Sequence, residues 1–92
     1  MESNTSGFSR IVEMMPDVFD AHEFILALIK EETYEYFSLL RDCNFDFART
    51  HAWISNRLVN NADEFSISYF NEKRVSMDIF HEQRPCAVFE RR

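Results

Sequence analysis

The sequence predicts an α+β domain in which three main helices are followed by a small antiparallel β-meander packed on them. Two observations support this fold class. Up to about residue 60 the apolar residues recur every three or four positions, which is the period of an amphipathic helix. From about residue 64 they alternate, which is the period of a strand. A chain of 92 residues, 46% of them hydrophobic and 15% aromatic, is sufficient for one core and too short for two.

The N-terminal segment is predicted to be an extension of this domain. Residues 1–7 are small and polar and are expected to form a disordered tail. A helical stripe follows at Phe8, Ile11, Val12 and Met15. A helix this short forms only when it docks on the rest of the protein. Residues 1–14 are therefore predicted to be a flexible extension, with or without a short docked helix, and residues 15–92 a single α+β domain.

Capping residues indicate where the first two main helices begin and end. Asp20, with Glu23 three residues later, has the form of a capping box, and Asp17 is an alternative cap one turn earlier. Thr33 is predicted to cap the second helix, and Asn44 to end it in a left-handed conformation. The buried side of the second helix is expected to carry Tyr36, Phe37, Leu40 and Cys43.

The third helix is predicted over residues 46–60, with Asp46 as its cap and an Asn-Asn pair at its end. Its core face is expected to consist of Phe47, His51, Ile54 and Leu58. Its opposite face carries Arg49, Trp53, Asn56, Arg57 and Asn60. His51 is thus predicted to be a buried structural histidine that is neutral and hydrogen-bonded, because burial disfavours the charged imidazolium.

The meander is predicted to consist of three strands, at residues 64–70, 75–80 and 86–92. The segments between them, "NEKR" and "HEQRP", have the length and composition of hairpin connections. Pro85 stands at the start of the last strand, where its missing N–H is tolerated.

Composition excludes several classes of function. The net charge of −6 opposes phosphate backbones and anionic lipids at long range. The longest apolar run, "FILALI" (24–29), is far shorter than a membrane span. The first ten residues lack the charged and apolar regions of a secretion signal. We therefore expect a cytoplasmic protein in which Cys43 and Cys86 are reduced thiols.

No pattern in the sequence predicts catalysis, a cofactor or a metal. The metal-ligating side chains show neither helical ligand spacing nor a C-x-x-C or H-E-x-x-H motif: His22, Cys43, His51, His81 and Cys86. Cys43 with a distant histidine lacks the flanking glycines of a nucleophile site. The single glycine, Gly7, excludes a glycine-rich phosphate loop. The protein is expected not to be an enzyme.

The stretch "RTHAWISNRLVNN" (49–61) contains no Asp or Glu, which favours an interaction site. Trp53, flanked one turn away by Arg49 and Arg57, is typical of protein interfaces. A partner protein, or a second copy presenting its acidic helices, would complement this face. The sequence therefore predicts a non-enzymatic interaction module that self-associates through residues 46–60.

The alternative function is a winged-helix-like DNA-binding regulator, or a DNA mimic. The predicted helices and strands have a helix-turn-helix outline with a following wing. The side chains suited to bases and phosphates are Arg49, Asn56, Arg57 and Asn60. Residues 16–48, however, carry eight acidic and two basic residues, so they would repel the duplex. Nucleic acid is therefore disfavoured as a partner.

Two stretches, "MPDVFDAHEFI" (15–25) and "THAWISNRL" (50–58), resemble short, uncharacterised proteins of gut Bacteroides-type bacteria. The resemblance covers about half of the chain and does not extend to the predicted strands. It implies a bacterial cytoplasmic protein in which Met15 corresponds to a family-like start and residues 1–14 are an extension. Because these proteins have no established activity, it implies no substrate, cofactor or catalytic residue.

Overall fold

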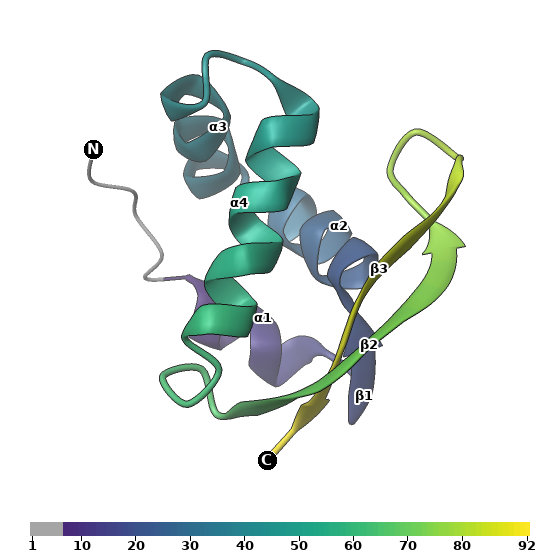
Figure 1. Ribbon diagram of the computed structural model, residues 1–92. Helices are drawn as coiled ribbons and strands as arrows, with labels where there is room; N and C mark the ends of the chain where they lie inside the picture. Colours follow the sequence, from purple (N-terminus) through teal and green to yellow (C-terminus); the bar gives the residue numbers. More distant parts are fainter. Residues whose placement is uncertain (1–6) are drawn as a thin grey trace.

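The computed structural model of the protein describes residues 7–92, which form four helices and a three-stranded antiparallel sheet (Figure 1). In chain order the elements are α1 (Phe8–Met14), β1 (Val18–Asp20), α2 (Ala21–Glu31), α3 (Thr33–Asp42), α4 (Phe47–Asn60), β2 (Ile67–Met77) and β3 (Gln83–Arg91). The predicted α+β class is confirmed. The described part of the chain has four helices rather than three, and one strand precedes the main helices.

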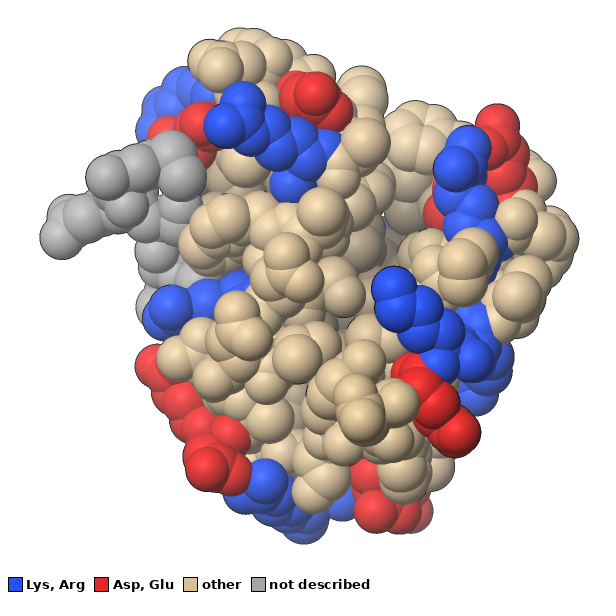
Figure 2. Space-filling model, viewed as in Figure 1, with Lys and Arg blue, Asp and Glu red and all other residues tan. Residues whose placement is uncertain are grey.

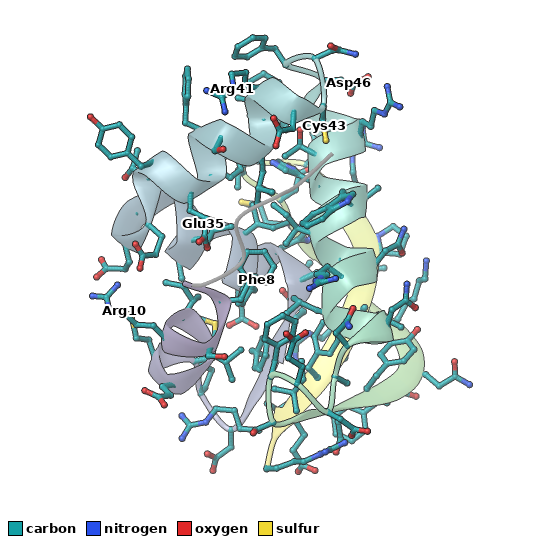
Figure 3. The ribbon with its side chains drawn as sticks, turned by 90° about the vertical axis from the view of Figure 1, so that its left-hand side faces the viewer. Phe8, Arg10, Glu35, Arg41, Cys43 and Asp46 are labelled. Atoms are coloured by element: carbon teal, nitrogen blue, oxygen red, sulfur yellow. The ribbon has the colours of Figure 1, made fainter. Side chains whose placement is uncertain are left out.

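Helix α1 is docked on the core. Phe8 and Ile11 are fully buried, and the Phe8 ring meets Phe24 of α2 edge-on with 5.1 Å between centroids. Gly7 is also buried, and its N–H donates to Glu35 of α3 at 3.0 Å, next to Phe8 (Figure 3). The predicted apolar stripe is thus confirmed. The predicted disordered tail is wrong at Gly7, and its remainder lies outside the described residues.

The sheet differs from the predicted meander, because its strand order is β1-β3-β2. The segment "NEKR" (71–74) is no turn: β2 runs through it and pairs with β3 on both sides of an irregularity between Tyr69 and Lys73. Asn71, with φ 60°, lies in this irregularity. A polar, exposed edge strand and a hairpin turn have similar compositions, which explains the error. The remaining strand of the sheet is β1, which was not predicted, and its Phe19 pairs with Phe89 of β3.

Side-chain caps fix the starts of α2 and α4 as predicted. Asp20 accepts from the Glu23 N–H at 2.9 Å while Glu23 accepts from the Asp20 N–H at 3.0 Å, which completes the capping box. Asp46 accepts from the backbone N–H at the third position of α4. Thr33 is not the cap of α3: it is the first residue of that helix, and its hydroxyl donates to the Ile29 carbonyl. Asn44 has the predicted left-handed conformation, with φ 58°.

The buried faces of α3 and α4 are rotated relative to the predicted ones. On α3, Phe37 is 53% exposed and Leu39 is buried in its place. On α4, Phe47 is 44% exposed, whereas Thr50 is fully buried. The Thr50 hydroxyl donates to the Asp46 carbonyl, so its burial leaves no unsatisfied polar atom. Ile54 and Leu58 are fully buried as predicted.

The core lies where α2 and α4 pack against β3, the central strand. Phe89 of β3 stacks on Phe19 at 5.5 Å and contacts Tyr69 at 5.7 Å between ring centroids, so aromatic rings join all three strands. No helix in residues 7–92 combines the length and the apolar character needed to cross a membrane.

Candidate functional site

The predicted interaction face lies on the exposed side of α4. Arg49, Asn56 and Asn60 are exposed, as expected. Trp53 and Arg57 are half-buried, and Trp53 packs against the core. The face therefore exposes two amides and one arginine, beside a tryptophan that also supports the fold.

Four of the five predicted residues line one hollow. Trp53, Asn56, Arg57 and Asn60, together with Asn61, surround a depression of about 290 Å³. Arg49, one helical turn before Trp53, is not among the lining residues. The depression thus contains four residues of the predicted face together with Asn61, which was predicted only to end the helix.

Charged side chains are sparse over the middle of α4. In Figure 2 the surface over the middle of α4 is mostly uncharged, and charged side chains lie near the start of this helix, toward the hairpin and along the outline of the view. Arg57 pairs with Glu64 at 3.7 Å. The buried Nε of Arg57 has no hydrogen-bond partner among the described residues. One arginine of the face is thus already neutralised within the chain.

His51 lies on the opposite flank of α4, between two phenylalanine rings. Its ring stacks on Phe80 with 6.2 Å between centroids and meets Phe47 edge-on at 6.3 Å. Its Nε2 is 2.8 Å from the Tyr36 hydroxyl. Burial lowers the pKa of His51, and the negative charge of Asp78 only partly opposes this. His51 is half-buried rather than fully buried, but it has the hydrogen bond that the sequence analysis expected.

Two further hollows lie between the helices and the β2–β3 hairpin. One of about 370 Å³ is lined by residues of α2, α4, β2 and β3, including His22, His51 and Cys86. The other, of about 390 Å³, lies toward the hairpin tip and is lined by His22, His51, Asp78 and Phe80 among others. The two histidines border both hollows. Titratable side chains therefore border both of these concave surfaces.

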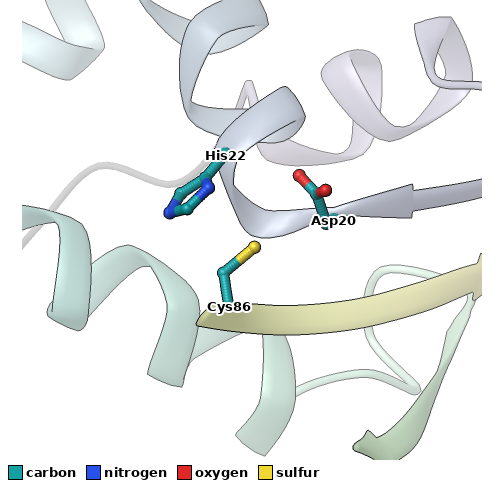
Figure 4. Close-up of side chains that lie close together, drawn as sticks. All are labelled: Asp20, His22 and Cys86. Carbon is teal, nitrogen blue, oxygen red and sulfur yellow. The ribbon is translucent and has the colours of Figure 1, made fainter. Parts of the chain in front are cut away.

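His22 and Cys86, which line the first hollow, form a polar cluster with Asp20 (Figure 4). Donor atoms of Asp20, His22 and Cys86 all lie within 4.8 Å of one another. The Ser76 hydroxyl bridges two of them, at 2.8 Å from His22 Nδ1 and 3.6 Å from Cys86 Sγ. Asp20 and Cys86 are buried and His22 is half-buried.

The carboxylate of Asp20 is held in its charged form. Arg74 donates to it from Nε at 3.1 Å and from Nη2 at 2.9 Å, and Arg74 also pairs with Glu23 at 2.8 Å. Burial acts to raise the pKa of Asp20, but hydrogen bonds from the Glu23 backbone, Arg74 and Ser76 outweigh it, so this pKa lies below its usual value.

This cluster was not predicted from the sequence. Asp20 and His22 are close in sequence, but Cys86 is far away and reaches them only because β3 pairs with β1. No local spacing could have revealed this. The thiol that had been considered for nucleophilic chemistry, Cys43, is buried at the end of α3, and the thiol beside a histidine is Cys86.

Comparison with family models, with curated proteins and with solved structures finds no match for this chain. The resemblance to short proteins of gut Bacteroides-type bacteria therefore stays a prediction. Function has to be inferred from the geometry of the chain itself.

Proposed function

We propose that the protein is a non-enzymatic interaction module that self-associates through the exposed face of α4. The observation that carries this proposal is the sparsity of charge over the middle of α4 (Figure 2), in a chain with 28% charged residues. The centres of protein interfaces are depleted in charged residues, and charged groups lie at their rims. Trp53 and Arg57 beside this face are the residue types that concentrate binding energy in interfaces.

A second copy of the chain is the partner that this face suits best. In a twofold-symmetric dimer the same patch meets itself, so the patch must be self-complementary. The amides of Asn56 and Asn60 each carry donors and acceptors and can pair across such an axis. The net charge of −6 makes two copies repel one another at long range, which favours contact through a surface with few charges. Arg49, on the exposed side of α4, is available to the acidic helices of the second copy.

A winged-helix-like DNA-binding regulator, or a DNA mimic, is the second proposal. The observation that favours it is the sheet: α4 is followed by the β2–β3 hairpin, and the earlier strand β1 pairs with β3. Strand β3 contacts α4, so in this proposal the hairpin would serve as the wing. Opposing it, the face offers only two arginines, and Arg57 already pairs with Glu64. Phosphate contacts are the main source of duplex affinity, so few free cations weaken this proposal.

We further propose a bacterial, cytoplasmic setting. Both cysteines are free and buried, which suits a reducing compartment.

Sedimentation velocity over a range of concentrations tests self-association. We expect the wild type to form dimers, and Asn56→Arg to be monomeric because it brings two like charges together at the twofold axis. Tyr34→Arg is the matched control, since Tyr34 is 93% exposed on α3, and it should dimerise like the wild type. A wild type that stays monomeric, or an Asn56→Arg variant that still dimerises, would contradict the proposal.

Electrophoretic mobility of a random DNA duplex tests the second proposal. The wild type should leave the duplex unshifted at moderate salt. A shift that weakens steeply with added salt and is lost on changing Arg49 to Ala would favour the DNA-binding function instead.

A further inference from the structure

We infer that Asp20, His22 and Cys86 form a binding site for a single transition-metal ion of the zinc type. The three side chains supply a carboxylate oxygen, an imidazole nitrogen and a thiol sulfur, all within 4.8 Å of one another. Thiolate and imidazole ligands select zinc and its neighbours over magnesium and calcium, which prefer sites made of oxygen alone. This site is independent of the α4 face and of self-association.

The backbone holds two of the ligands in place before any ion binds. Asp20 ends β1 and pairs with Val88 of β3. Cys86 is two residues from Val88 on the same strand, and residues two apart point to the same face of a sheet. The hydrogen bonds of the sheet therefore place the carboxylate and the thiol side by side, and His22 follows in the first turn of α2.

The distances require only a small contraction. Ligands at about 2.0–2.3 Å from a tetrahedral zinc ion are separated from one another by roughly 3.3–3.8 Å. The donor atoms of this cluster lie within 4.8 Å, so a closure of roughly 1 Å suffices. His22 is half-buried and borders the 370 Å³ hollow, so its ring has room to adjust. The hollow also gives a water molecule access to a fourth coordination position.

The surrounding charges balance a divalent ion. Zinc binds cysteine as the thiolate, and Cys86 lies in the same cluster as Asp20. The thiolate and Asp20 together then neutralise the ion. Arg74 and Glu23, which already form an ion pair beside Asp20, cancel one another. Arg74 also orients the carboxylate, as outer partners of metal ligands commonly do.

The effect of substituting Ser76 distinguishes a metal site from a purely structural network of hydrogen bonds. The Ser76 hydroxyl bridges His22 Nδ1 and Cys86 Sγ, and an ion bound through His22 Nδ1 would take the place of this hydroxyl. If the cluster exists only to satisfy buried polar groups, Ser76 is an essential member of it. If the cluster binds metal, Ser76→Ala should keep or strengthen the affinity.

Titration of the full chain with Co²⁺ under reducing conditions tests the inference. Cobalt serves as a spectroscopic substitute for zinc, and a thiolate ligand gives a charge-transfer band in the near ultraviolet. We expect this band to saturate at one ion per chain and to disappear when Zn²⁺ is added. His22→Gln should weaken binding at least about tenfold, corresponding to about 1.4 kcal/mol. Cys86→Ser should abolish the band.

The chain provides matched controls. Cys43→Ser removes the other buried thiol and His81→Gln removes an exposed histidine, and both should leave the titration unchanged. Thermal melting of each metal-free variant shows whether it is folded. If Cys86→Ser does not fold, the titration of His22→Gln tests the inference instead, because His22 is only half-buried. Absence of the band in the wild type, or its equal loss in Cys43→Ser, would overturn the inference.

Discussion

The immediate surroundings of His51 set its charge. Two phenylalanine rings flank it, and the Tyr36 hydroxyl forms a hydrogen bond with its Nε2. Burial lowers the pKa of His51 from the ordinary value of 6.5. A lowered pKa means that the unfolded chain takes up the proton more readily than the folded chain. The stability that neutral His51 contributes is therefore complete above about pH 6.5 and decreases as the pH falls toward the folded pKa.

We predict that the free energy of unfolding falls between pH 7.5 and pH 5 by a larger amount in the wild type than in His51→Gln. The glutamine amide can still pair with Tyr36, but it does not titrate. Urea denaturation at both pH values measures the difference, with His81→Gln as the exposed control. At neutral pH, His51→Ala should cost about 1–3 kcal/mol, through lost packing and an unpaired Tyr36 hydroxyl. Equal pH dependence in the wild type and His51→Gln would show that His51 titrates as an exposed histidine does.

Residues whose roles depend on near neighbours were predictable. The caps Asp20 and Asp46 act on backbone groups three positions away, so the sequence contained the whole interaction. Phe47 was wrongly assigned to the core and Thr50 was not included in it, because the neighbours of α4 determine which of its sides is covered. The Asp20, His22 and Cys86 cluster depends on strand pairing and could not be read from spacing.

At the scale of single elements, β2 contains an irregularity that the sequence analysis took for a turn. Between Tyr69 and Lys73 the strand has three residues, whereas β3 has one, Val88, between their partners. The two extra residues leave the alternation of faces unchanged, because two is the period of a strand. Asn71 takes the left-handed conformation that absorbs them, and asparagine tolerates it better than most residues do.

We predict that Asn71→Val destabilises the protein by about 1–2 kcal/mol, because a β-branched side chain is strained at positive φ. Asn71→Gly should be within about 0.5 kcal/mol of the wild type. Urea denaturation measures both. Glu72→Val is the control, since Glu72 is the exposed neighbour and has no positive φ. If Asn71→Val and Glu72→Val have equal effects, the left-handed residue does not determine the stability of β2.

At the scale of the whole molecule, α1 belongs to the core. Phe8 is fully buried and packs against Phe24 and Phe65, so α1 connects α2 with the segment that leads into β2. A core of this size depends on each of its large side chains, because small domains bury a modest share of their surface.

We predict that Phe8→Ala lowers the free energy of unfolding by about 3–5 kcal/mol, a large part of the roughly 5–15 kcal/mol that stabilises a typical domain. Met14→Ala, at a 48% exposed position of the same helix, should change it by less than about 0.5 kcal/mol. Thermal and chemical denaturation compare the two. Similar, small effects of both substitutions would mean that α1 is not required for the fold.

The fold class was predictable at this scale and the topology was not. The change from helical to strand periodicity marks the α+β division of the chain. Strand β1 has only three residues, too few to show an alternating pattern, and its partner is remote: Phe19 pairs with Phe89, 70 positions later. The meander was predicted because adjacent strands usually pair, and here the central strand is the last in sequence order.

The position of β3 has a consequence for protein synthesis. Ribosomes add residues in order, so β1 and β2 are both complete before residues 83–91 have been made. The two strands do not neighbour one another in the sheet, and each has to wait for β3. A nascent chain that stops before Gln83 therefore has two strands without a partner and a core that lacks Phe89. The sheet therefore cannot form until β3 has been synthesised, and until then the unpaired strands expose the edges that chaperones and proteases recognise.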